Sequence, residues 1–239
     1  MRLVPLAICL LVPTLTAVDA DACGLSPPIG PNGLPGVCRG ESSTVRVRVG
    51  LSVGGTATKI KFGDERADLL QGATVATLDV SPLDALTLSG AFGAALGGRV
   101  DFREVRHDLR PGYLGGLGVS YRLLDGRGAL PFAHASFTYS IARATTRAPD
   151  ATEATFTSKD WRVGLSIGKV VFGRVAPYVV GRFFGAGTDW SVGGGKGSDA
   201  FRYHVGVGSA FALGDHLDGL LEAAVLGERR LSIGLGWTL

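Results

Sequence analysis

Two serines of this sequence stand in the pattern that surrounds the nucleophile of many hydrolytic sites. Ser52 and Ser166 each lie at the centre of a G-x-S-x-G pentapeptide, GLSVG and GLSIG. The pattern supports catalysis only where a sharp strand-to-helix turn exposes the serine. Both copies fall inside runs in which apolar and small residues alternate, and no helical pattern follows. We therefore interpret them as stretches of strand and assign neither serine a catalytic role.

Histidine beside a hydroxyl or a carboxylate is the second arrangement that could carry chemistry. His134 and Ser136 lie two residues apart and so share one face of a strand, with Ser140 further along. His107 and Asp108 are adjacent in a polar stretch. The run GGGKGS at 193–198 lacks Gly-Lys directly before Ser or Thr and precedes a strand, which is the wrong context for a phosphate loop. We predict no catalytic residue, no metal site and no cofactor.

Arginine is the most frequent charged residue on the polar rows of the predicted strands. We expect such a row to be structural, with buried Arg and carboxylates bracing an interior through charge-assisted hydrogen bonds. The alternative is a narrow path that favours anions, since rings of Arg select anions. The predicted inward set is Arg46, Arg48, Asp79, Arg122, Arg162, Arg182, Arg202, His204 and Glu222.

The elements that position these residues are strands, because the dominant pattern from Thr44 onward has a period of two. The first run is the clearest, with Val45, Val47 and Val49 alternating with Arg46 and Arg48. Ten strands are predicted, at 45–54, 73–80, 85–96, 113–124, 132–141, 155–168, 175–185, 200–213, 220–226 and 230–239.

The connections between these strands alternate in length. Short turns at 81–84, 125–128, 169–174 and 214–216 alternate with longer polar loops at 55–72, 97–111, 143–154 and 187–198. The last hairpin, at 227–229, is short where a long loop is due. This layout is typical of a transmembrane barrel. We predict an all-β fold, a closed antiparallel up-and-down transmembrane β-barrel over 44–239 with ten strands, or alternatively eight.

The composition of the two faces indicates which one meets lipid. The apolar rows are almost free of charge, whereas Gly, Ser, Thr and Arg on the opposite rows would pack poorly as a core. A soluble lipocalin-like barrel, with its apolar face inside, is the alternative fold. Aromatic residues on the apolar rows gather near strand ends, as they do at membrane interfaces: Tyr113, Tyr139, Trp161, Phe201, Phe211 and Trp237.

The start of the chain carries the features of an export signal. One basic residue, Arg2, precedes a short apolar run, and Ala20-Asp21-Ala22 supplies small residues for cleavage, so 1–22 is predicted as a signal peptide. The next segment, 23–43, is rich in Pro and Gly and contains Cys23 and Cys38. We expect these two cysteines to form a disulfide in an oxidising compartment. Lipidation of Cys23 is the alternative. The net charge is +3, and loss of one basic and two acidic residues with 1–22 makes it +4, too weak to indicate nucleic acid.

The C-terminus, SIGLGWTL, resembles that of bacterial outer-membrane β-barrels, in which a polar residue, a glycine and alternating hydrophobic residues form the signal read by the barrel-assembly machinery. Ser232, Gly234, Trp237 and Leu239 match these positions, although the family usually ends in Phe or Trp. In size the chain is similar to the small OmpA-like and opacity-type barrels.

This resemblance implies a protein of the Gram-negative outer membrane, with the lipid bilayer and the assembly machinery as partners. We expect a non-enzymatic structural or surface-interaction role. The alternatives are a narrow anion-favouring solute channel and a lipid-modifying enzyme, because outer-membrane lipid A deacylases resemble this chain in using a His-x-Ser pair on a barrel strand.

Overall fold

The computed structural model describes residues 45–126, 130–192 and 194–239. The predicted signal peptide, Cys23 and Cys38 lie outside these residues. No helix among the described residues is long and apolar enough to span a membrane. The strands of the described part are β1 Arg46–Phe62, β2 Glu65–Leu83, β3 Leu86–Phe102, β4 Val105–Leu109, β5 Gly112–Asp125, β6 Phe132–Arg147, β7 Glu153–Gly168, β8 Val175–Trp190, β9 Gly195–Asp199, β10 Tyr203–Ala212, β11 Leu217–Gly227 and β12 Arg229–Thr238.

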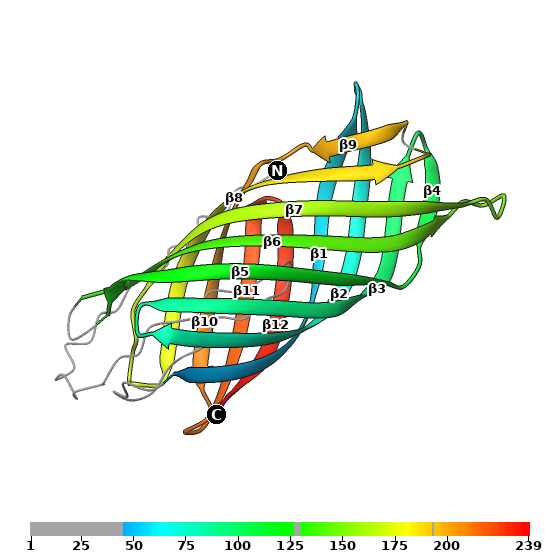
Figure 1. Ribbon diagram of the computed structural model, residues 1–239. Coiled ribbons are helices and arrows are strands. Elements are labelled where there is room, and N and C mark those ends of the chain that lie inside the picture. Colours follow the sequence, from blue (N-terminus) through cyan, green and yellow to red (C-terminus); the bar gives the residue numbers. More distant parts are fainter. Residues whose placement is uncertain (1–44, 127–129, 193) are drawn as a thin grey trace, which may run out of the picture.

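These strands form one antiparallel ring (Figure 1). β3 pairs with β5 from Leu86 to Ala95 and with β4 from Gly98 to Phe102, so β4 and β5 are two parts of one barrel strand. β8 pairs in the same way with β9 and β10. The ring closes where β12 pairs with β1, from Arg48 opposite Thr238 to Ala57 opposite Arg229. The barrel therefore has ten strands, as the sequence predicted.

The number of strands changes along the barrel axis. The β11–β12 hairpin turns back at Glu228, part of the way up the wall. Beyond it β9 pairs directly with β1, with Ile60 opposite Asp199 and Lys61 opposite Ser198. β4 likewise continues the wall to β6 there. The ring thus has ten strands at one end and eight at the other, which explains why this hairpin is short where a long loop was expected.

The four longer connections are not the polar loops that the sequence predicted. Most of their described residues continue the strands, and the hairpin turns lie at 63–64, 103–104, 148–152 and 191–192. On β1 the two faces exchange character along this extension: Lys59 and Lys61 face outward, whereas Ile60 and Phe62 are buried inside. A barrel surrounded by water keeps its apolar side chains inside. The alternation of polar and apolar residues continues in these segments, but the polar residues now face outward and the apolar ones inward. The segments therefore resembled polar loops in the sequence.

The rest of the wall has the opposite arrangement, with apolar residues outside. Val49, Leu51 and Val53 are exposed on β1, while Arg48 and Ser52 are buried between them. We call the exposed apolar rows of all strands the belt. An apolar outer band around a polar interior is the arrangement that a bilayer requires, and a lipocalin-like barrel would show the reverse. We call the end with the four long hairpins the hairpin end, and the opposite end the turn end.

Candidate functional site

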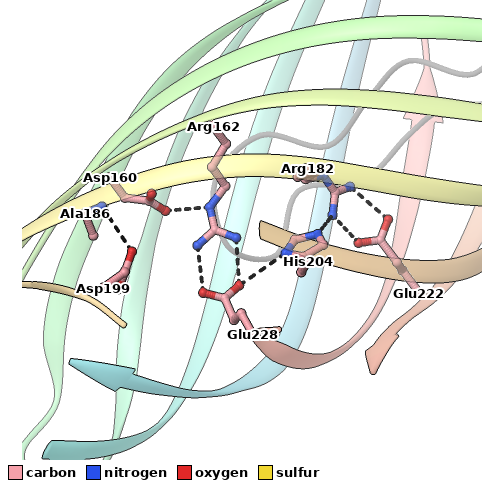
Figure 2. A network of polar contacts seen from close by, with 8 residues as sticks. All are labelled: Asp160, Arg162, Arg182, Ala186, Asp199, His204, Glu222 and Glu228. Carbon is pink, nitrogen blue, oxygen red and sulfur yellow. Dashed lines mark hydrogen bonds and ion pairs between the residues drawn. The ribbon is translucent and has the colours of Figure 1, made fainter. Parts of the chain in front are cut away.

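The lumen of the barrel holds a network of buried ion pairs that begins at Arg162 on β7. Its Nε donates to Asp160 over 2.5 Å, and its two terminal nitrogens donate to the carboxylate of Glu228 over 2.7 and 3.1 Å (Figure 2). Glu228 reaches this position because it forms the tip of the short β11–β12 hairpin, which ends inside the wall. Bidentate contacts of this kind are the strong form of the Arg–carboxylate pair.

A second pair continues the network toward the turn end. Arg182 on β8 donates to both oxygens of Glu222 over 2.6 and 2.9 Å, and it lies 2.9 Å from Nε2 of His204. The Tyr178 hydroxyl also donates to Glu222. His204 in turn lies 3.6 Å from Glu228, so it links the two pairs (Figure 2).

Charge balances within this network. Arg230 is buried beside Glu222 and Glu228 and interacts electrostatically with both. Its guanidinium thus joins those of Arg162 and Arg182, and the three face the three carboxylates of Asp160, Glu222 and Glu228. A buried charge without a partner is strongly destabilising. The equal numbers of opposite charges indicate a bracing network, in which Arg230 contributes its charge although its guanidinium nitrogens form no hydrogen bond to the described residues.

A separate cluster lies near the turn end, around Arg48. This guanidinium donates to Asp79 over 3.1 Å and to both oxygens of Asp218 over 3.0 and 2.5 Å. Gly236 on β12 leaves the space that the guanidinium fills, because a Cβ atom there would overlap it. The glycines of the inner face therefore make room for long charged side chains.

At the hairpin end the lumen is filled by apolar side chains instead. Trp190 is buried at the centre, with its ring 5.7 Å from those of Phe62 and Phe102 and 6.1 Å from that of Phe156. The ring of His107 meets it edge to face at 5.0 Å. We call this cluster the plug, and its other members are Ile60, Ala67, Leu69, Val100, Leu109, Ala144 and Ala154.

A hydrogen bond fixes the Trp190 side chain in the plug, since its Nε1 donates to the Thr146 hydroxyl over 2.8 Å. That hydroxyl donates in turn to the carbonyl of Ala154. A buried indole N–H is therefore satisfied.

Most of the arginines and acids that the sequence placed in the lumen face inward in the structure. Arg48, Asp79, Arg162, Arg182, His204 and Glu222 are buried there. Arg46 and Arg122 lie at the turn end and contact Asp84, through its carboxylate and its carbonyl respectively.

Arg202 differs from the prediction. It is exposed on the outer surface, because the interruption between β9 and β10 breaks the alternation just before it.

Sequence reasoning missed four charged residues of the lumen, namely Asp160, Asp218, Glu228 and Arg230. Asp160 was detectable, since it shares the inward row of Arg162 two residues away. Arg230 also shares its strand's polar row, with Ser232. Glu228 carries no such signal, because it lies in a turn that the fold carries into the lumen.

The residues with possible catalytic chemistry form no hydrogen-bonded set among the described residues. His134 on β6 stands opposite Ser166 on β7 in the strand register, but its Nε2 atom has no hydrogen-bond partner there. Ser52 lies within β1, and Ser166 lies two residues before the end of β7, which leads into a turn and not into a helix. His134 packs against the Phe132 ring on its own strand. His107 belongs to the plug, whereas its neighbour Asp108 is exposed. Within the described residues no group of His, Cys, Asp and Glu could hold a metal ion.

The C-terminal strand places its two predicted rows on opposite faces. Ser232 and Gly234 face the lumen, while Trp237 and Leu239 are exposed outside. The Trp237 ring also stacks on His216 at 5.7 Å, at the turn end.

One carboxylate at the edge of the network belongs to the part of the wall beyond the belt. Asp199, the last residue of β9, accepts a hydrogen bond from the backbone N–H of Ala186 over 3.0 Å (Figure 2). Burial raises its pKa to about 7, and the nearby carboxylates of Asp160 and Glu228 act in the same direction. The side chain therefore changes charge near neutral pH.

No protein-family model matches the chain, and no curated protein matches it. Several solved outer-membrane barrels are similar in architecture. The translocator domain of the autotransporter NalP from Neisseria meningitidis is 11% identical with a TM-score of 0.48, over 82% of this chain and 89% of that one. An outer membrane channel from Pseudomonas putida F1 is 9% identical with a TM-score of 0.45, over 84% of this chain and 97% of that one. The N-terminal β-barrel domain of Pseudomonas aeruginosa OprF is 14% identical with a TM-score of 0.37, over 80% of this chain and 97% of that one.

The class of the protein follows from the structural features of this chain itself. A closed ring of strands, an apolar belt outside and a charged interior together satisfy the backbone and the side chains in a bilayer. The chain has the fold of a transmembrane β-barrel.

Proposed function

We propose that this protein is a closed, non-enzymatic barrel with a structural or surface-interaction role in the outer membrane of a Gram-negative bacterium. The observation that carries the proposal is that the lumen is filled at two levels, by the balanced ion network around Arg162 and by the plug around Trp190. The four long hairpins would then project from the cell surface and form the part available for contact. Residues 1–22 would be removed on export, and Cys23 and Cys38 would pair.

A narrow anion channel is the alternative, and the state of the arginines argues against it. An anion-selective ring needs cations that face the path with their charge uncompensated. Arg48, Arg162 and Arg182 each form ion pairs with buried carboxylates instead. A passing anion would have to replace these carboxylates and separate opposite charges within the barrel.

Conductance in planar bilayers tests the closed lumen. Purified, heat-modifiable barrel inserted at a known protein-to-lipid ratio should give no steady unitary current in about 1 M KCl, a salt concentration at which weak surface charges are screened. Stable, reproducible steps from the folded form would overturn the proposal. Heat-denatured protein at the same concentration is the control for leakage through damaged lipid.

The non-enzymatic part of the proposal rests on the lumen-facing position of the candidate His and Ser side chains and on the lack of a hydrogen bond to His134 Nε2 among the described residues. His134 and Ser136 lie on the lumen face, away from the lipid that a deacylase would have to reach. Lipid A from cells that produce the wild-type barrel should have the same acyl composition as lipid A from cells that produce His134→Ala, as measured by mass spectrometry. An acyl chain missing from the wild-type sample alone would show that the protein is a lipid-modifying enzyme and would contradict the proposal.

Assembly can be tested separately at the C-terminal strand. We expect the barrel-assembly machinery to recognise Trp237 and Leu239, since both are exposed on the outer face. The double variant Trp237→Ala/Leu239→Ala should lower the amount of folded barrel in outer-membrane fractions. Val45→Ala, at another exposed residue, should not.

A further inference from the structure

The outer surface of the barrel carries a cavity where the wall is interrupted. Regular pairing of β8 stops at Gly187 opposite Ser198 on β9 and resumes at Phe183 opposite Tyr203 on β10. Three residues of β8 therefore face four on the other strand. A cavity of about 530 Å³ opens at this point.

The lining of the cavity divides into an apolar part and a charged part. Tyr139, Trp161 and Phe183 come from the outer face of three neighbouring strands and remain largely exposed. Lys159 and Arg202 are the cations of the lining, and both are exposed. Neither takes part in an ion pair or a side-chain hydrogen bond to the described residues, whereas the lumen arginines Arg48, Arg162 and Arg182 do.

Buried side chains close the cavity on the lumen side. Phe184, which is 1% exposed, lies in the lining and also stacks against the guanidinium of Arg162 at 4.8 Å. Asp199 reaches the lining as well and is bonded to the backbone of Ala186. The cavity is thus a pocket in the wall with its mouth on the outer surface.

The height of the pocket places it at the edge of the belt. Its apolar side continues into Val163 and Leu165 on β7, which are exposed outer residues of the belt. Its other side adjoins β9, whose partner on β1 is the stretch in which Lys59 and Lys61 replace aliphatic residues on the outer face. Aromatic residues beside cations at this level are typical of a membrane interface.

We propose that this pocket binds a phosphorylated lipid of the outer leaflet, with Lys159 and Arg202 on the phosphate and the aromatic residues along the acyl chain. The inference rests on the proposed insertion in the outer membrane with the hairpins outside. Two cations that form no ion pair with the described residues complement a phosphate, and Arg offers two parallel donors to its oxygens. An apolar surface beside them, open to the bilayer, suits a chain attached to that phosphate.

Two pairs of variants separate this pocket from general surface charge and from general surface shape. The pair Lys159→Gln/Arg202→Gln removes the cations of the lining, and Arg66→Gln/Arg147→Gln removes two exposed cations elsewhere at the hairpin end. Gly187→Leu fills the pocket, because nothing lies within 4 Å of a Cβ atom there. Gly181→Leu is its match, on the same strand with the same open space but outside the lining.

The assay is titration of full-length mature barrel in a neutral detergent with diphosphoryl lipid A, followed by native mass spectrometry. Dephosphorylated lipid A and inorganic phosphate are the comparison ligands. We expect one lipid per barrel, with binding about tenfold weaker or more after loss of both cations, since charge-assisted hydrogen bonds are lost. Gly187→Leu should weaken binding comparably, and neither matched control should change it.

The contrary results are equally clear. Equal loss in the Arg66/Arg147 control would mean that the lipid responds to surface charge alone. Equal binding of dephosphorylated lipid A would remove the role of the cations, and full competition by inorganic phosphate would make the site one for the free ion. Each variant must first show heat-modifiable mobility. A barrel that inserts but fails these tests refutes the lipid site alone, whereas absence from outer-membrane fractions would refute the proposed location.

Discussion

Removing the charge of Glu228 should destabilise the barrel far more than removing the charge of an exposed glutamate. Glu228 is 3% exposed and accepts two hydrogen bonds from Arg162. Glu228→Gln leaves three guanidinium groups against the two carboxylates of Asp160 and Glu222. The expected cost is about 3 to 5 kcal/mol, the range for a buried pair that loses one partner. That is a large share of the roughly 5 to 15 kcal/mol by which native proteins are stable.

A matched surface pair sets the scale. Glu65 forms an ion pair of 2.6 Å with Arg103 at the hairpin end, where both side chains are well exposed to solvent. Glu65→Gln should cost about 1 kcal/mol or less. A double variant that also replaces Arg162 by Met restores charge balance. Its cost should fall below the sum of the single costs by about 1 kcal/mol or more, the coupling expected of direct partners.

The assay is urea unfolding in detergent micelles, followed by the fluorescence of the three tryptophans of the chain. Unheated and heated gel samples establish that each variant begins folded. If Glu228→Gln unfolds at the same urea concentration as Glu65→Gln, the lumen network does not brace the barrel and the reasoning fails.

Three further predictions follow from the plug, the edge carboxylate and the short hairpin. Trp190→Ala should cost about 3 to 5 kcal/mol in the same urea assay, because it empties the centre of the plug; a smaller loss than from Trp237→Ala would contradict this. Asp199 has a folded pKa raised to about 7, so the folded state binds the extra proton and stability falls as pH rises from about 4 through 7. Asp199→Asn, which keeps an acceptor oxygen, should flatten that part of the pH profile, and an unchanged slope would assign it to other groups. Gly227→Ala should lower the urea midpoint more than Gly63→Ala: both residues have positive φ, of 77° and 61°, but only at Gly227 does an added Cβ overlap a neighbouring backbone carbonyl. Equal midpoints would show that the hairpin yields.

The sequence alone was sufficient for the properties that depend on alternation along one strand. Val49 and Leu51 face outward and Arg48 and Ser52 inward because successive side chains of a strand point to opposite faces. The same local rule located Arg162 and Arg182 in the lumen and showed that Ser52 and Ser166 lack the turn that catalysis needs. These conclusions required no knowledge of which strands become neighbours.

Alternation failed where the surroundings of the strand change. Ile60 and Phe62 continue the inward row of β1, yet they are apolar where that row had been polar. The inward row therefore lost its polar signature while the backbone stayed extended, and 55–72 was interpreted as a loop. The alternation of residues does not show whether lipid or water surrounds a given part of the wall. That surrounding determines whether polar or apolar side chains face the lumen.

Only the tertiary structure decided the features that depend on closure of the ring. β9 and β1 are far apart in the chain, and they pair at Asp199 and Ile60. This pairing leaves eight strands in the ring at the hairpin end and ten at the turn end. That closure places Glu228, a turn residue, beside Arg162 inside the barrel. It also puts Arg202 on the outer surface at the interrupted wall. Local periodicity describes one strand at a time, whereas these positions are set by contacts between strands that the chain brings together only when the barrel closes.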